Sequence, residues 1–126
     1  MTFNIYVSHQ RSFNFKKELY EPIRQSSLND KYNFVLPHEI SDEVFNSKEY
    51  LQNYAHLVIA EVSAPATGLG IELGWADIYE IPIICIYRRG SKLSGSLKIV
   101  STKFIEYSNS SELIFEIEQI LIAISK

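Results

Sequence analysis

Short runs of apolar residues alternate along the chain with segments that show helical periodicity. The runs are rich in β-branched and aromatic side chains and cover residues 3–7, 33–36, 57–62, 81–87 and 104–107. Phe15, Leu19 and Ile23 recur at helical spacing after the first run, and residues 72–79 form another helical segment after the third. The sequence therefore predicts alternating strands and helices, with a short loop between the last two strands and a helix at the end.

The two central runs, 57–62 and 81–87, are apolar at almost every position, as strands are when helices cover both faces of a sheet. Such runs, alternating with helices, favour a parallel sheet. The predicted fold is an α/β, flavodoxin-like or Rossmann-like sandwich, with a five-stranded parallel sheet in the order 2-1-3-4-5 and helices on both faces. No repeat or linker divides the chain, so we expect residues 1–126 to form one domain.

Pro22 lies inside the first predicted helix. An interior proline loses a backbone hydrogen bond and clashes with the preceding turn. We therefore expect a kink or a break at this position.

The last predicted helix covers residues 109–126 and opens with a capping pattern, Asn-Ser-Ser followed by Glu112. Its apolar stripe, which should pack on the sheet, consists of Leu113, Ile117, Ile120, Leu121 and Ile124. Phe115 and Ile122 lie off this stripe. Apolar surface that a monomer would leave exposed favours self-association, so we expect a homodimer or a higher homo-oligomer.

The composition excludes several classes of partner. Among 126 residues, 12 Lys and Arg face 15 Asp and Glu, and no basic run is present, so we expect no nucleic acid polymer as a partner. The apolar runs are far shorter than the ~20 residues that span a bilayer, so we expect no membrane partner. Cys85 is the single cysteine, which excludes an internal disulfide. Because the opening residues also lack the pattern of a secretory signal, we expect a cytoplasmic protein.

Ligands of open parallel sheets bind beyond the carboxyl ends of the strands, where the strand order reverses. The first three predicted strands end in polar residues where a core would be apolar, which makes Ser8, His9, His38 and Glu39 candidates for lining a cleft. The three histidines lack the HxH and HxxxH spacings of a zinc site. We therefore expect neither a metal nor a cofactor.

Glycines and a glutamate follow the third predicted strand. Gly68 and Gly70 allow a close backbone approach and positive φ, and a helix starting near Gly70 would present free N–H groups to an anion or a sugar oxygen. A tight turn without any ligand would also use these glycines. Glu72 falls in the first turn of that helix, where the helix dipole favours its ionised form. It is either a nucleophile aimed into the cleft or a carboxylate that points at water.

At this point the chain resembles a known family. The stretch LVIAEVSAPATGLGIELGWA, followed by the apolar strand IPIICIYR, looks like the signature block of the nucleoside 2-deoxyribosyltransferase superfamily, which includes 2′-deoxynucleoside 5′-monophosphate N-glycosidases. The likeness extends to NIYVS, VLPHE and KLSGS, so it spans most of the chain. It implies a substrate that is a nucleoside or a nucleotide.

The resemblance also implies roles for individual residues. Glu72 matches the glutamate that attacks the anomeric carbon of the sugar and forms a covalent glycosyl-enzyme, which water or a second base then resolves. Tyr6 matches a tyrosine that positions the nucleophile or the sugar. Ser94 matches a serine that reaches across a dimer interface to the 5′-phosphate.

Two positions depart from the family pattern. His56 stands where the family has an aspartate that orients the sugar or protonates the leaving base, and a histidine can supply that proton near neutral pH. Ala66 replaces a Ser or Asp that contacts the phosphate or the sugar, and Thr67 beside it could substitute if the loop shifts. In the first loop, Arg11 could hold the phosphate.

Three readings follow from these residues. The leading one is cleavage or transfer at the N-glycosidic bond of a nucleoside or nucleoside 5′-monophosphate through a covalent glycosyl-glutamate intermediate. The second is a TIR-like enzyme that cleaves NAD, because IYVSHQ followed by a helix loosely resembles TIR domains. The third is a non-catalytic nucleotide-binding module of the same fold. Trp75 and Tyr79, four residues apart, are expected to pack at a helix or subunit contact rather than on a base.

Overall fold

A single parallel sheet forms the centre of the molecule. The computed structural model describes residues 2–124. The strands are β1 (Asn4–His9), β2 (Asn33–Val35), β3 (Leu57–Glu61), β4 (Ile83–Arg88) and β5 (Lys103–Tyr107). They lie in the order β2-β1-β3-β4-β5, and every neighbouring pair is parallel. The predicted fold class and strand order are therefore confirmed.

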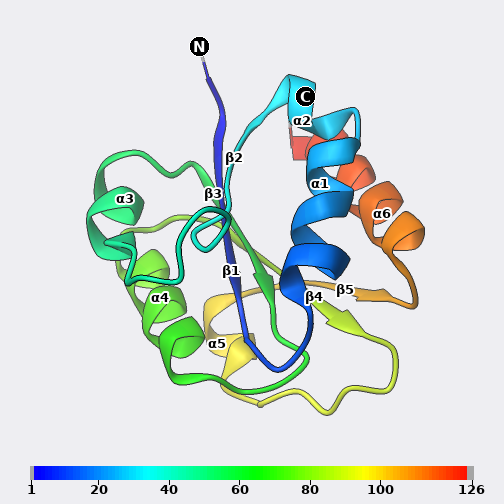
Figure 1. The fold of residues 1–126 in the computed structure, drawn as a ribbon. Helices are drawn as coiled ribbons and strands as arrows, with labels where there is room; N and C mark the ends of the chain where they lie inside the picture. Colours follow the sequence, from blue (N-terminus) through cyan, green and yellow to red (C-terminus); the bar gives the residue numbers. More distant parts are fainter. Residues whose placement is uncertain (1, 125–126) are drawn as a thin grey trace.

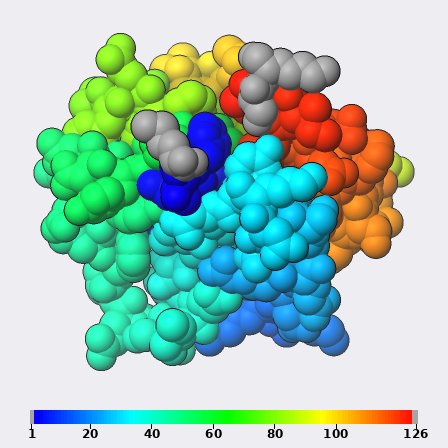
Figure 2. Space-filling model, turned by 90° about the horizontal axis from the view of Figure 1, so that it is seen from above, coloured from blue at the N-terminus to red at the C-terminus, as the bar shows by residue number. Residues whose placement is uncertain are grey.

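Helices cover both faces of the sheet (Figure 1). On one face lie α3 (Ser47–Asn53), α4 (Thr67–Ile78) and α5 (Leu97–Val100); on the other lie η1 (Lys16–Tyr20), α1 (Glu21–Gln25), α2 (Leu28–Lys31) and α6 (Ser110–Ile124). Seen from the edge where the strands begin, the start of β1 lies between α3 and α4 on one side and α2 and α6 on the other (Figure 2). Within the described residues, no helix is both long and apolar enough to cross a membrane.

Successive side chains of β1 point to opposite faces of the sheet and so belong to different cores. Ile5 and Val7 belong to the core beneath α1 and α6, whereas Tyr6 belongs to the core beneath α4. Ser8 shares the face of Tyr6, because residues two apart in a strand point to the same side. The strand thus delivers two hydroxyl groups toward α4.

The first helical segment changes its winding next to Pro22 but continues through it, so the expected break does not occur. Residues Lys16–Tyr20 form a π-helical turn, and α1 follows directly with Pro22 in its first turn. In an α-helix, the missing N–H of Pro22 would have bonded the carbonyl of Glu18. That carbonyl accepts a hydrogen bond from Ser110 Oγ of α6 at 3.4 Å. The carbonyl that Pro22 leaves without a helical partner therefore links this segment to α6.

Helix α4 begins earlier than the sequence predicts. It starts at Thr67 rather than near Gly70, so Gly68 and Gly70 are helical, and among the described glycines only Gly90 has a positive φ. Glu72 consequently lies in the second turn, where the dipole of the helix end acts on it less. The prediction failed because two glycines close together weaken the helical signal of the first turn.

Helix α6 largely follows its predicted pattern. Asn109 Oδ1 accepts a hydrogen bond from the Glu112 N–H at 2.9 Å, and Leu113, Ile117 and Leu121 are buried. The placement of Ile124 on the buried stripe is wrong, because its side chain is 46% exposed at the end of the helix. Phe115 and Ile122 are exposed, as expected for residues off the stripe, whereas residues 125–126 of the predicted helix lie outside the described part of the chain.

The cap of α6 is a test of the fold's stability. Replacing Asn109 with Ala removes the acceptor of the Glu112 N–H, so the free energy of unfolding should fall by about 1 kcal/mol. Urea denaturation followed by circular dichroism measures this change. Ser111→Ala, an exposed substitution in the same turn, is the control and should change stability far less.

Candidate active site

The carboxylate of Glu72 is held at both of its oxygens by hydroxyls of β1. Tyr6 Oη donates to Oε2 at 2.7 Å, and Ser8 Oγ donates to Oε1 at 2.7 Å. The two donors are two residues apart on one strand, so both reach the same face of the sheet. Glu72 projects toward them from α4, and its side chain is half-buried.

Burial keeps the phenol of Tyr6 protonated. Its side chain is fully buried, and burial, followed by the charge and hydrogen bond of Glu72, raises the pKa of Tyr6 far above its ordinary value. Tyr6 is therefore a permanent donor to the carboxylate near neutral pH. Ser8 is also fully buried, so its hydroxyl is shielded from water.

A pocket of about 550 Å³ opens beside Glu72. It is bounded by the ends of β1 and β2, one face of α4, the start of α3 and the irregular segment before α3. The lining residues are Tyr6, Arg11, His38, Asp42, Val44, Phe45, Asn46, Ser47, Lys48, Gly68, Ile71, Glu72 and Trp75. Aromatic and charged groups are thus brought together with the carboxylate at the strand-order reversal, where the sheet topology predicts a site.

One face of α4 forms a wall of this pocket. Gly68, Glu72 and Trp75 follow one another at helical spacing, and a side chain at Gly68 would meet no atom within 4 Å. Gly68 therefore leaves open space one turn before the carboxylate. Trp75 packs against the core beneath α4, as expected for a helix contact, and it also lines the pocket. Lys48 Nζ lies 5.9 Å from the centroid of its ring.

Arg11 and His38 both reach the pocket, as the sequence predicts. Arg11 is half-exposed, and its Nη2 lies 3.8 Å from Asp42 Oδ1. The guanidinium also lies 5.7 Å from the centroid of Phe15. The pKa of His38 is lowered, mainly by burial and then by the charge of Arg11, which favours a neutral imidazole near pH 7.

His9 is buried among aromatic side chains and does not line the pocket, which corrects its predicted role in substrate binding. Nδ1 is 2.8 Å from the Gln10 carbonyl, and Nε2 is 2.7 Å from Tyr20 Oη. A carbonyl can only accept, so Nδ1 carries the proton and Nε2 accepts from the Tyr20 hydroxyl. Burial is the main cause that lowers the pKa of His9 to about 4. His9 is therefore a neutral structural histidine.

His56 is absent from the pocket because it precedes β3 and so lies at the amino edge of the sheet. Its Nδ1 accepts from the Asn4 N–H at 2.9 Å, and its ring stacks on Phe3. Glu72 is held at the other edge, near the end of β1. The predicted catalytic role of His56 is therefore corrected: parallel strands separate their two ends by the length of the sheet.

Four further predicted residues also lie away from Glu72. Glu39 is engaged by Arg24, which donates to both of its oxygens at 2.8 Å and lowers the pKa of that carboxyl. Thr67 is exposed at the start of α4. Gly70 and Ser94 line a second, mainly apolar pocket of about 490 Å³ on the other side of α4, where Gly74 also contributes.

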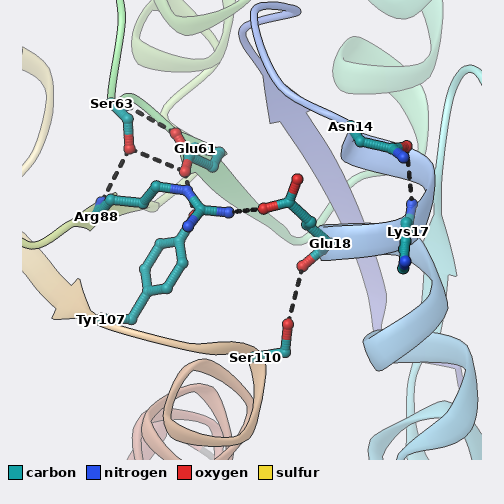
Figure 3. Close-up of polar contacts among 8 residues, drawn as sticks. All are labelled: Asn14, Lys17, Glu18, Glu61, Ser63, Arg88, Tyr107 and Ser110. Carbon is teal, nitrogen blue, oxygen red and sulfur yellow. Dashed lines mark hydrogen bonds and ion pairs between the residues drawn. The ribbon is translucent and has the colours of Figure 1, made fainter.

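Glu61, a polar residue at the end of β3, is committed to an internal network (Figure 3). Its carboxylate is fully buried and accepts from the Ser63 N–H at 2.7 Å, from Ser63 Oγ at 2.9 Å and from the Tyr107 hydroxyl. The Arg88 N–H donates to Ser63 Oγ at 2.9 Å, and the Arg88 guanidinium pairs with Glu18. This network anchors the segment that leads from β3 into α4.

Sequence reasoning missed the wall that comes from the irregular segment between β2 and α3. Asp42, Val44, Phe45 and Asn46 belong to it, and Lys48 follows in α3. Irregular segments show no periodicity, so nothing in the pattern placed them at the site. The cap of α3 was a usable signal, because an asparagine three residues before a glutamate is typical of a helix start, and Asn46 Oδ1 accepts from the Glu49 N–H at 3.2 Å. Within residues 2–124, no three His, Cys, Asp or Glu side chains are grouped to hold a metal ion.

Known proteins share parts of this sequence and its fold. No protein-family model matches the chain. Over 65 residues it is 38% identical to a protein of Syntrophotalea carbinolica named "Putative 2'-deoxynucleoside 5'-phosphate N-hydrolase 1". This match covers 47% of the chain and 44% of the relative's own length.

Two solved structures superpose on almost the whole chain. The Clostridium botulinum CMP N-glycosidase BcmB has a TM-score of 0.66 and 18% identity, over 91% of this chain and 98% of that one. A conserved protein from Enterococcus faecalis V583 has a TM-score of 0.63 and 18% identity, over 94% of this chain and 99% of that one. At this level of identity the likeness shows the fold.

The buried His9 predicts a pH dependence of stability. Burial, with His38 and Arg11 nearby, lowers its pKa from 6.5 to about 4, so between these values the folded protein binds fewer protons than the unfolded chain. The stability that results is present above pH 6.5 and is lost as the pH falls toward 4. Between pH 7 and pH 5 it should decrease by about 2 kcal/mol.

His9→Gln should remove this part of the pH dependence, because glutamine does not titrate. Urea denaturation at the two pH values measures the difference between wild type and variant. Ser111→Ala, at an exposed residue of α6 that does not titrate, is the control and should keep the wild-type dependence. An equal pH dependence in wild type and His9→Gln would contradict the assignment of His9 as a buried neutral residue.

Proposed function

We propose that this chain, whose resemblance to the nucleoside 2-deoxyribosyltransferase superfamily is supported by its relatives and its fold, cleaves or transfers at the N-glycosidic bond of a nucleoside or nucleoside 5′-monophosphate. The names of the relatives support nucleotide N-glycosidase activity in general, without indicating a particular nucleotide. The observation that carries the proposal is the half-buried carboxylate of Glu72, fixed at both oxygens beside a pocket of about 550 Å³.

In the proposed reaction, Glu72 acts as the nucleophile. One carboxylate oxygen attacks C1′ of the sugar, and the base leaves with the electrons of the C1′–N bond. The resulting glycosyl ester is then attacked at C1′ by water or by a second base, which restores the carboxylate. One difficult displacement thus becomes two easier ones, as in retaining glycosidases. Tyr6 supports this role because its hydroxyl stays protonated and so remains a hydrogen-bond donor to the carboxylate.

The pocket offers groups for the rest of a nucleotide. Arg11 is suited to bind a 5′-phosphate. Its ion pair with Asp42 is half-exposed and contributes little free energy, so a phosphate can take the place of the Asp42 carboxylate. Trp75 and Phe45 present aromatic surface on which a base can stack. In this proposal His38 is a neutral polar group of the wall, and Gly68 leaves space beside the sugar.

The comparisons do not favour the two alternative readings, a TIR-like NAD-cleaving enzyme and a non-catalytic module. Ser94 lies on the far side of α4 within one chain, so its proposed contact with a phosphate requires a second copy. Self-association and that contact stay predictions.

Glu72→Gln tests the nucleophile. The amide keeps the shape of the side chain but lacks the negative charge, so release of free base should fall by about 10³-fold or more. Products are separated by chromatography after incubation with a panel of nucleosides and monophosphates, with and without an acceptor base. Formation of a new nucleoside or nucleotide only when the acceptor base is present indicates transfer, and release of free sugar or sugar phosphate indicates hydrolysis.

Asp77→Asn is the matched control, because Asp77 is an exposed carboxylate of the same helix. It should retain wild-type turnover. Rapid quenching followed by mass spectrometry should find the peptide of Glu72 heavier by one sugar or sugar phosphate. Undiminished turnover in folded Glu72→Gln would end the proposed mechanism.

The single tryptophan allows binding to be measured directly. Trp75 lines the pocket and is the only tryptophan of the chain, so its fluorescence reports on the site without a label. A bound nucleotide whose base stacks on the ring should quench this emission in a saturable way. Arg11→Gln should weaken the apparent affinity for a monophosphate about 10-fold or more, while leaving affinity for the nucleoside nearly unchanged. Equal weakening for both ligands would show that Arg11 does not hold the phosphate.

A further inference from the structure

Ser8 occupies a position where a hydroxyl has to find a partner. It lies near the carboxyl end of β1, paired in register with Ala60 of β3, and is fully buried. A buried hydroxyl without a partner costs free energy, and here the hydroxyl donates to Glu72 Oε1 at 2.7 Å. The contact joins strand to helix across 64 residues of sequence. It is therefore a tertiary contact aimed at one carboxylate oxygen.

The two oxygens of Glu72 have different surroundings. Tyr6, the partner of Oε2, lines the pocket together with Glu72. Ser8, the partner of Oε1, is as fully buried as Tyr6 but is not a lining residue of that pocket. Oε2 is thus the oxygen whose donor borders the pocket, and Oε1 is the oxygen whose donor does not.

We propose that Ser8 is a positioning residue that holds Oε1 as the non-attacking oxygen while Oε2 forms the bond to the sugar. This inference rests on the proposed function. The Oε2–C1′ bond forms as the C1′–N bond breaks, and the bonding electrons leave with the base. In the ester, Oε1 is the carbonyl oxygen and keeps its hydrogen bond from Ser8. In hydrolysis, water bonds to C1′, the C1′–Oε2 electrons return to Oε2, and the proton of the water passes to solvent.

Without Ser8, the carboxylate would lose its fixed orientation as well as a donor to its negative charge. A hydrogen bond to a charged group is stronger than one between neutral groups, so loss of this donor should lower kcat by about 10- to 100-fold. Ser8 does not touch the substrate, so KM should change less than about two-fold.

The test compares Ser8→Ala with a buried serine elsewhere. Ser101 is also buried, and its hydroxyl donates to the Ile83 and Lys103 carbonyls at the amino edge of the sheet. Ser101→Ala makes the same chemical change away from Glu72 and should leave kcat and KM as in wild type. Ser8→Cys keeps the volume of the side chain with a weaker donor, and it replaces Ser8→Ala if that variant fails to fold. Its kcat should lie between wild type and Ser8→Ala.

A second readout needs no substrate. A carbodiimide with glycinamide labels carboxyl groups, so the rate at which Glu72 is labelled at one pH, followed by mass spectrometry, reports how firmly its oxygens are held. In Ser8→Ala, and not in Ser101→Ala, Glu72 should be labelled faster than in wild type. If no nucleotide is cleaved by wild type, the proposed function fails, and faster labelling would still support the hold of Ser8 on Glu72. Equal labelling and equal kcat in Ser8→Ala and Ser101→Ala would overturn the proposal.

Discussion

A carboxylate clamped between two hydroxyls of the central strand is the interaction on which the site depends. Tyr6 and Ser8 reach Glu72 only because β1 lies inside the sheet and α4 packs over that face of it. A half-buried negative charge must be hydrogen-bonded to be tolerated, and here both oxygens are. The requirement fixes which way the helix faces, and with it the face of α4 that meets the pocket.

Two glutamates whose carboxylates lie near the same edge of the sheet differ in burial and hydrogen bonding, and therefore in what they can do. Glu61 is fully buried and accepts three hydrogen bonds, two of them from Ser63, so its carboxylate is used up in holding the end of β3. Glu72 accepts two and is open to the pocket. The first is suited to support and the second to chemistry, because only the second can meet another molecule.

Much of the fold could be predicted from the sequence, and the reasons differ by element. The strands were visible because apolar, β-branched runs end in polar residues, and the strand order followed from their alternation with helices. The start of α4 was not visible in the sequence, because Gly68 and Gly70 have low helix propensity although both lie in its first turn. At the site, the meeting of Glu72 with Tyr6 was foreseeable from the motif, but the hold of Ser8, the neutral state of His9 and the distance of His56 depend on strand register and burial. Those are properties of packing between segments, which local patterns do not carry.

Helix α4 separates two hollows that meet different faces of it. Gly68 faces the pocket of Glu72, whereas Gly70 and Gly74 face the apolar pocket on the far side, and a side chain added at any of the three would meet no atom within 4 Å. The partition between the hollows is thus one helix thick and free of bulky groups at these points. Sequence change on the far face can remodel that surface while the carboxylate of Glu72 keeps its neighbours, so the two sides of the helix are free to diverge independently.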